Sequence, residues 1–190
     1  MMPDLTIRPL TFADVPRLSE IDAEFESDRF LDVTKITDGL SVAWHLIEHP
    51  LVPPFRSTDY SFTETDCDEI GARLLKGNGL WLVAQDESGR PVVLLDMERE
   101  GWHHAARVWN IAIGRAYRRQ GLGRELMRRA LAWARGENLR AVWLEAQTNN
   151  LPACRFYQAV GFKLCGIDDH FYSNDDIGVN EVAIFWWHEL

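Results

Sequence analysis

The segment that decides the fold reads Arg115-Ala116-Tyr117-Arg118-Arg119-Gln120-Gly121-Leu122-Gly123-Arg124. It joins a predicted strand over 106–113 to a predicted helix over 122–134, whose apolar residues recur at the spacing of one buried helix face. Glycines at two positions let backbone N–H groups approach an anion closely, and a helix N-terminus adds donors and partial positive charge. Arginine side chains supply charge-assisted hydrogen bonds to phosphate oxygens. The segment therefore predicts a pyrophosphate site at the start of a helix.

The spacing and charge of this loop distinguish it from other glycine-containing helix entries. The spacings of a Walker P-loop and of a Rossmann dinucleotide fingerprint are both absent, which excludes those two phosphate sites. A glycine-containing helix entry with a solvated basic face would also explain the residues taken alone. Residues 115–129 nevertheless hold six arginines and a single acidic residue, in a chain whose formal net charge is −9. Such a dense cluster in an acidic protein favours a specific polyanion.

The rest of the chain is predicted as a mixed α/β fold in one domain. Strands are expected at 5–8, 80–84, 92–98, 106–113, 141–147, 162–164 and 179–187, and helices at 12–25 (capped by Thr11), 41–48, 68–76, 122–134 and 152–161. The turn at Glu87-Ser88-Gly89-Arg90 makes a hairpin of the second and third strands. Residues 26–79 give the weakest pattern.

Three blocks of sequence resemble the GNAT superfamily of N-acetyltransferases. Residues 118–123 resemble its Q/R-x-x-G-x-G/A signature, and Trp109-Asn110-Ile111-Ala112-Ile113 its preceding splayed strand. Residues 149–162, Asn-Asn-Leu-Pro-Ala-Cys-Arg-Phe-Tyr-Gln-Ala-Val-Gly-Phe, are similar to its N-x-x-A-x-x-F/Y-Y-x-x-x-G-F block. The resemblance implies one N-acetyltransferase domain over residues 1–190, with a mostly antiparallel central sheet flanked by helices. It also implies acetyl-coenzyme A as cosubstrate and no metal.

A narrower resemblance points to streptothricin acetyltransferases. Residues 144–151 and 153–157 resemble their L-E-T-Q-x-N-N-L-x-A-C-K-F-Y run, and 171–174 and 183–186 resemble their ending. This implies a small cationic amine as acceptor and a role in antibiotic resistance. An acceptor at a protein N-terminus, a polyamine, and a non-catalytic coenzyme-binding regulator stay open as alternatives.

The resemblance assigns the cofactor residues. Backbone groups around Ile111 to Ile113 are expected to pair with the pantetheine arm, as an added strand would. The loop is expected to hold the pyrophosphate, with Arg118 or Arg124 meeting a phosphate charge. Asn150 is expected to hydrogen-bond the pantetheine arm, which Ala153 and Phe156 would line. The predicted cofactor-binding residues are Ile111, Ala112, Ile113, Arg118, Arg119, Gln120, Gly121, Leu122, Gly123, Arg124, Asn150, Ala153 and Phe156.

The catalytic assignment rests on two residues. Tyr157 is predicted to be the general acid that protonates the departing thiolate, although a phenol in an apolar helix is also common core packing. Many relatives carry an acid just before the Ile-Ala-Ile position, where this chain has Trp109-Asn110. Glu145 is therefore the predicted base, with Asp96 and Glu98 as substitutes. The predicted substrate-binding residues are Asp96, Glu98, Trp109 and Asn110.

Composition limits the partners. The acidic net charge argues against a general nucleic-acid binder. No apolar run approaches the ~20 residues of a membrane span, and the first residues lack a signal-peptide pattern. The three cysteines imply no disulfide framework, so a cytoplasmic protein is expected. Residues 1–100 carry 20 acidic and 9 basic side chains, which suits a cationic acceptor. A homodimer is an open alternative.

One motif suggests a different class of enzyme. His45-Leu46-Ile47-Glu48-His49 spells H-x-x-E-H, an inverted zinc-peptidase motif, which would need a rigid helix and a third ligand. Pro50 follows directly and prevents a regular continuation of such a helix. Cys154 has no histidine beside it in the sequence, so packing explains it better than nucleophilic catalysis.

Overall fold

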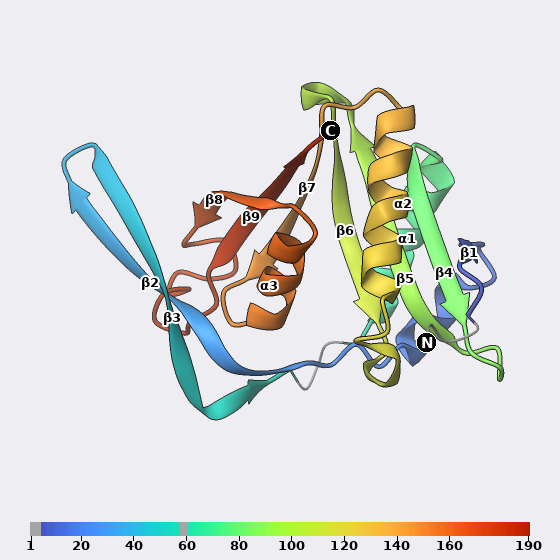
Figure 1. The fold of residues 1–190 in the computed structure, drawn as a ribbon, viewed down its shortest axis with the longest axis horizontal. Helices are drawn as coiled ribbons and strands as arrows, with labels where there is room; N and C mark the ends of the chain where they lie inside the picture. The colour runs from blue at the N-terminus through green and yellow to red at the C-terminus, as the bar shows by residue number, and fades with distance from the viewer. Residues whose placement is uncertain (1–4, 58–60) are drawn as a thin grey trace. The chain divides into compact units, whose positions relative to one another are not determined.

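The computed structural model describes residues 5–57 and 61–190. The chain forms two compact units, which are described separately (Figure 1). The first unit contains the described residues of Met1–Glu24, Thr58–Leu144 and His188–Leu190, and the second contains Phe25–Ser57 and Glu145–Trp187. The described residues include no helix long and apolar enough to cross a membrane.

The sheet of the first unit has the strand order β1-β4-β5-β6-β7. Neighbouring strands run antiparallel up to β6, and β7 then pairs with β6 in parallel. Parallel neighbours need a crossover connection, which α2 supplies. The strands are β1 (Arg8–Pro9), β4 (Gly79–Gln85), β5 (Pro91–Glu100), β6 (Ala105–Ile113) and β7 (Ala141–Gln147), the last continuing into the second unit.

Helices cover the two faces of this sheet. α2 (Leu122–Gly136) contacts β6 and β4, and α1 (Glu64–Lys76) contacts β4 and the short 3-10 helix η1 (Val15–Glu20). Figure 1 shows α2 in front of the strands and α1 behind them. The central strand β5 is therefore buried on both sides, from Pro91 through Glu98. Two further 3-10 turns are η2 (Gly101–His103) and η3 (Arg115–Tyr117).

The two ends of helix α1 are set by its capping residues. Thr63 and Asp66 form a reciprocal capping box at its start, which satisfies two backbone donors. Gly77 ends the helix in the left-handed conformation, at φ 67°.

The second unit is built on a long antiparallel hairpin. Its strands β2 (Glu26–Asp38) and β3 (Ser41–Arg56) pair from one end to the other, with a bulge near Ser27. In this unit, β9 (Ala183–Glu189) lies between the end of β7 and β8 (Lys163–Asp168). Strands β8 and β9 run antiparallel. The helix α3 (Leu151–Ala159) follows β7 directly.

Most predicted elements of residues 68–187 are confirmed with shifted ends, but two predictions in the first half are wrong. Residues 41–48 lie in β3 and not in a helix, because each of them pairs with a residue of β2. The predicted helix over 12–25 is only the six-residue η1, and Phe25 lies beyond it. The predicted first strand at 5–8 is reduced to Arg8–Pro9.

Candidate active site

Strand β6 changes its pairing halfway along. It pairs with β5 over its whole length, but with β7 only from Ala105 to Val108. At this point Asp96 faces Asn110 and Met97 faces Val108, so Trp109 is an extra residue in β6. Such a bulge bends a strand and ends regular pairing. Within the described part of the first unit, no strand pairs with the other edge of 109–113.

This edge suits an extended ligand. Backbone N–H and C=O groups along an unpaired strand edge can hydrogen-bond to an added strand-like group. The pantetheine arm of coenzyme A carries two amides and has that character. The segment Ile111 to Ile113, predicted from the sequence for this contact, lies on this edge.

The loop after β6 is fixed by one arginine. The Nε of Arg118 donates to the carbonyl oxygen of Ile113 at 2.9 Å, and its terminal nitrogen donates to that of Ala23 at 2.8 Å. Burial lowers the pKa of the Arg118 guanidinium. Arg118 therefore ties the loop to the end of β6, and two of its donors are already used there.

The backbone of the loop turns through two left-handed residues. Arg119 has φ 63° and Gly121 has φ 89°, a conformation in which glycine is readily accommodated. Gly121 caps α2 without a side-chain hydrogen bond. Within the described residues, the backbone N–H groups of Leu122 and Gly123 have no hydrogen-bond acceptor. Unpaired amides at a helix N-terminus fit a pyrophosphate group.

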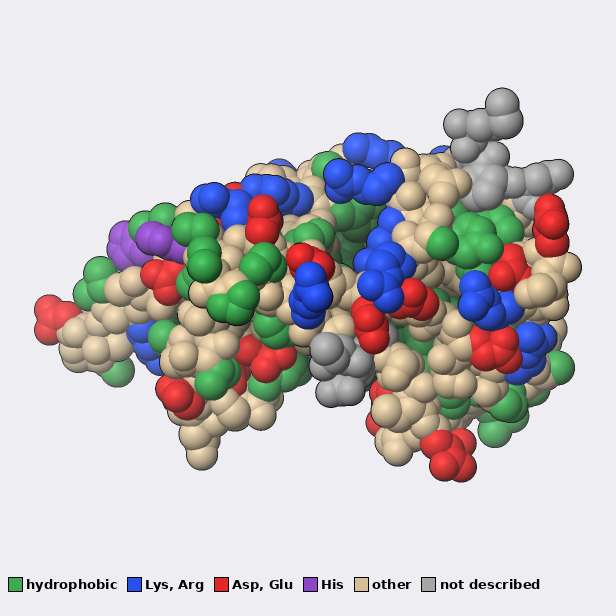
Figure 2. All heavy atoms as spheres, turned by 90° about the horizontal axis from the view of Figure 1, so that it is seen from below, with side chains coloured by type: hydrophobic (Ala, Val, Ile, Leu, Met, Phe, Trp, Pro, Cys, Tyr) green, Lys and Arg blue, Asp and Glu red, His purple; other side chains and the backbone are tan. Residues whose placement is uncertain are grey.

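Part of the arginine cluster has other roles. Arg115 forms ion pairs with Asp22 and Glu24, at 3.0 and 3.3 Å. Arg128 and Arg129 both bind Glu125, at 2.7 and 2.8 Å. Figure 2 shows acidic and basic side chains next to one another on the face seen from below. We therefore expect the polyanion to contact the loop and the first turn of α2, and not the whole arginine cluster.

Asp96 is the centre of a buried polar network. Its carboxylate is fully buried and accepts hydrogen bonds from Arg73 at 2.8 Å, Trp81 at 2.8 Å and Asn110 at 2.9 Å. Asn110 faces Asp96 across the β5–β6 pair, beside the bulge at Trp109. The network therefore joins α1, β4, β5 and β6 where β6 leaves β7. An enclosed carboxylate with its acceptor positions engaged is poorly placed to take a proton from an acceptor, so Asp96 as base or ligand stays only a prediction.

The other predicted acceptor residues lie around this network. Glu98 is buried on β5 and forms an ion pair with Lys76 at 3.0 Å, so Asp96 and Glu98 both face α1. Trp109 is 37% exposed, and the guanidinium carbons of Arg107 and Arg73 lie 3.6 and 4.8 Å from the centre of its ring. Two arginines against one ring form cation–π contacts, which hold the side chain in place.

In the second unit, α3 carries the predicted catalytic tyrosine. Asn150 is its N-cap, and the side-chain oxygen of Asn150 accepts a hydrogen bond from the N–H of Ala153 at 3.3 Å. The amide nitrogen of Asn150 carries two N–H donors. Tyr157 is buried, with ring contacts to Phe156, Phe162 and Trp186 at centroid distances of 5.5 to 6.2 Å. These contacts fix the direction of the phenol.

The predicted base lies on β7. The hydroxyl of Tyr172 donates a hydrogen bond to the Oε1 of Glu145. The sequence pattern did not point to Tyr172 as a partner of Glu145, because 27 residues separate them. Arg73 and Trp81 were missed for the same reason, since their role follows from contacts with Asp96 that no local spacing encodes.

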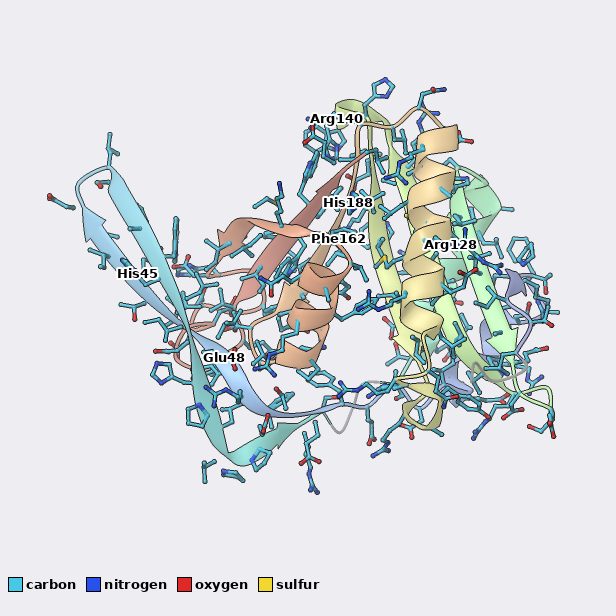
Figure 3. All side chains as sticks on the ribbon, viewed as in Figure 1. His45, Glu48, Arg128, Arg140, Phe162 and His188 are labelled. Atoms are coloured by element: carbon cyan, nitrogen blue, oxygen red, sulfur yellow. The ribbon has the colours of Figure 1, made fainter. Side chains whose placement is uncertain are left out.

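The zinc-peptidase motif does not have the geometry it needs. His45, Glu48 and His49 lie in strand β3, where residues 45 and 48 point to opposite faces. Figure 3 shows His45 and Glu48 at separate positions along this strand. Glu48 instead forms ion pairs with Arg29 and Arg155. Among the described residues, no group of three or more His, Cys, Asp or Glu side chains could hold a metal ion.

Comparison with known proteins places this geometry in a family. The acetyltransferase (GNAT) family matches residues 43–162. Streptothricin acetyltransferase A of Bacillus subtilis (strain 168) is 27% identical over 149 residues, covering 74% of this chain and 86% of that protein.

Two solved structures are similar over nearly the whole chain. The crystal structure of nourseothricin acetyltransferase has a TM-score of 0.81 at 25% identity, covering 98% of this chain and 99% of that one. A candidate streptothricin acetyltransferase of Bacillus anthracis str. Ames, solved in complex with acetyl coenzyme A, shares the fold with a TM-score of 0.74 at 24% identity, covering 100% and 99%. The chain belongs to the GNAT family and is an N-acetyltransferase that uses acetyl-coenzyme A.

Proposed function

We propose that the chain transfers acetyl from acetyl-coenzyme A to a primary amine of a small cationic acceptor, of the streptothricin class. The observation that carries the proposal is the unpaired edge of β6 over 109–113, followed by the left-handed loop into α2. The acceptor class is supported by the named relatives, because the similarity to the Bacillus subtilis protein extends over most of both chains. We further propose that residues 1–190 work as one domain, since the family match at 43–162 takes in parts of both units.

We propose that the cosubstrate is held mainly by backbone groups. Ile111, Ala112 and Ile113 would pair with the pantetheine arm, and the amides from Arg119 to Arg124 would bind the pyrophosphate. Asn150 would donate to the arm, with Ala153 and Phe156 against it. Arg118 would act through the loop that it ties down.

The acceptor must lose a proton before it can attack. A lysine-like amine has a pKa near 10.4, so reaching the neutral form at pH 7 costs about 4–5 kcal/mol. We propose that Glu145 takes this proton. The neutral nitrogen then attacks the thioester carbon, and a backbone N–H near Ile113 meets the oxyanion. As the carbon–sulfur bond breaks, Tyr157 gives its proton to the departing thiolate, and the proton that the attacking nitrogen loses on becoming an amide restores the phenol. Trp109, Asn110 and Glu98 would shape the acceptor side, with Asp96 fixing Asn110.

The proposal is tested by free thiol release from acetyl-coenzyme A against a panel of amines. The panel contains streptothricin, lysine, spermidine and short peptides, each at matched concentration. We expect turnover with streptothricin. Mass spectrometry should show that the product carries one added acetyl group. Turnover with spermidine or a peptide alone would agree with acetyltransferase activity but contradict the proposed acceptor class. Saturable coenzyme binding without turnover of any amine would favour a non-catalytic regulator.

A further inference from the structure

The contact between Tyr172 and Glu145 joins two parts of the second unit that are distant in sequence. Glu145 lies on β7, and Tyr172 lies in the segment between β8 and β9, residues 169–182. The phenol hydroxyl donates to one carboxylate oxygen of Glu145. Tyr172 is 38% exposed, so burial alone does not fix its position. Something else must hold the segment if this hydrogen bond is to matter.

Asp176 holds the segment from within. Its side chain is fully buried and accepts hydrogen bonds from the N–H of Tyr172 at 3.0 Å, the N–H of Ser173 at 2.7 Å and the hydroxyl of Ser173 at 2.6 Å. Burial raises the pKa of the Asp176 carboxyl, but these hydrogen bonds outweigh burial and leave that pKa below its usual value. A charged carboxylate therefore fixes the backbone at Tyr172 itself.

Two more contacts bracket the tyrosine. On one side, the Phe171 ring packs edge-on against Phe185 of β9, with centroids 5.8 Å apart. On the other side, the segment ends beside β7, because Thr148, which is buried directly after that strand, exchanges hydrogen bonds with Val182. The strand that carries Glu145 thus also anchors the segment that carries Tyr172.

We propose that Tyr172 is a positioning residue for Glu145, and that Asp176 holds it in place. The inference rests on the proposed function, in which Glu145 is the base. A glutamate side chain loses up to about 2 kcal/mol of rotamer freedom when ordered, so a half-buried one such as Glu145 needs a partner to stay in one orientation. The phenol donor of Tyr172 fixes one carboxylate oxygen of Glu145 and so orients the group that would take the proton of the acceptor amine.

The test is a double-mutant cycle of Tyr172→Phe and Glu145→Gln, measured as kcat and as KM for each substrate. Removing the phenol hydroxyl should lower kcat about tenfold, the size of one hydrogen bond to a charged group, while KM for acetyl-coenzyme A stays unchanged. In the Glu145→Gln background, Tyr172→Phe should have no further effect. Ser88→Ala is the matched control, because it also removes a hydroxyl that donates to a carboxylate, that of Asp86 at 2.5 Å in the turn between β4 and β5, and kcat should not change.

The outcomes separate this inference from the proposed function. If Glu145→Gln is slow and Tyr172→Phe is normal, or if the two effects multiply, Tyr172 does not act through Glu145 and the inference is overturned. A raised KM for the amine with unchanged kcat would also overturn it, by making Tyr172 an acceptor contact. If Glu145→Gln itself keeps full turnover with streptothricin, the base assignment and this inference both fall, but the acetyltransferase activity stands.

The role of Asp176 is tested in the same cycle. Asp176→Asn keeps the side-chain volume but weakens the acceptor for the two backbone N–H groups, so kcat should fall as in Tyr172→Phe. The effect should disappear in the Tyr172→Phe background. An unchanged kcat in Asp176→Asn, with the protein folded by circular dichroism, would show that Asp176 does not hold Tyr172.

Discussion

At the scale of single residues, the chemistry is assigned to side chains whose surroundings differ sharply. Tyr157 is buried among rings, Glu145 contacts a phenol, and Asp96 is enclosed by three donors. A group that must move a proton needs access to the reacting atoms, whereas a carboxylate with every acceptor position engaged serves structure. The contacts therefore separate Asp96, which the sequence offered as a substitute base, from Glu145, which it gave as the predicted base.

Tyr157→Phe removes only the proposed proton donor. General acid catalysis contributes about 10²–10⁴-fold, so kcat should fall at least about a hundredfold with KM for acetyl-coenzyme A unchanged. Steady-state kinetics at saturating streptothricin measures the change. Because the ring contacts remain, the melting temperature should stay the same. Wild-type kcat in this variant would leave Tyr157 with a packing role alone.

Cys154 is the residue for which a covalent mechanism would be considered. Burial raises the pKa of the Cys154 thiol to about 12, so almost none of it is thiolate at neutral pH. We expect Cys154→Ala to keep kcat within about twofold and to lose about 1 kcal/mol of stability from the small cavity. In the native protein, iodoacetamide should modify the exposed Cys165 first, as peptide mass spectrometry would detect. Loss of turnover in folded Cys154→Ala would indicate an acetyl-cysteine intermediate.

At the scale of elements, local patterns predicted the β6–loop–α2 segment well and the hairpin poorly. Residues 141–147 form a strand and 122–136 a helix, because each period is visible within a few residues. For β3, the alternation of Val42, Trp44 and Leu46 is also present, but its partner β2 is highly charged and gives no matching signal. The bulge at Trp109 depends on cross-strand register, which no single segment encodes.

The buried network at the bulge gives a stability prediction. Asp96→Ala leaves the guanidinium of Arg73 buried without its main partner, which should cost about 3–5 kcal/mol. Urea unfolding measures the loss. Glu69→Ala is the matched control, because Glu69 binds the same arginine but is 60% exposed, and its loss should be under about 1 kcal/mol. Equal effects of the two substitutions would contradict a central role for Asp96 in this network.

Glu125 should make α2 sensitive to acid. Hydrogen bonds from Arg128 and Arg129 lower the pKa of the Glu125 carboxyl from 4.5 to about 2. A lowered folded-state pKa contributes stability that is present above pH 4.5 and lost as the pH falls toward 2. Since the arginines are exposed, Glu125→Gln should cost only about 1 kcal/mol at neutral pH. Urea titrations of both proteins should show this difference shrinking below pH 4.5; a constant difference would contradict the ion pairs.

At the scale of the whole molecule, the proposed cofactor groups come from both compact units. The β6 edge and the loop belong to the first, and Asn150 with Tyr157 belongs to the second. These cofactor residues were predicted from three short blocks of sequence that follow one another in the family's order. No single block would have been enough to predict them. The sequence could not predict the division into units, because that follows from contacts between segments far apart in the chain.

Acetyl-coenzyme A should stabilise the folded chain as a whole. A ligand that binds only the folded state adds about 2.7 kcal/mol at a hundred times its Kd, which raises the melting temperature of a chain of this size by about 5–10 °C. Differential scanning calorimetry with increasing acetyl-coenzyme A measures the rise. Adenosine alone, which lacks the pyrophosphate and the pantetheine arm, should give almost none. An equal rise with adenosine would place the binding energy away from β6 and the loop.

The central claim is that acetyl-coenzyme A binds along β6 and at the start of α2, and amide hydrogen exchange tests it most directly. With saturating acetyl-coenzyme A, exchange should slow in residues 109–113 and 119–124, while the hairpin residues 30–48 exchange as before. Unchanged exchange in both of those segments, under conditions where calorimetry shows the ligand bound, would contradict the account.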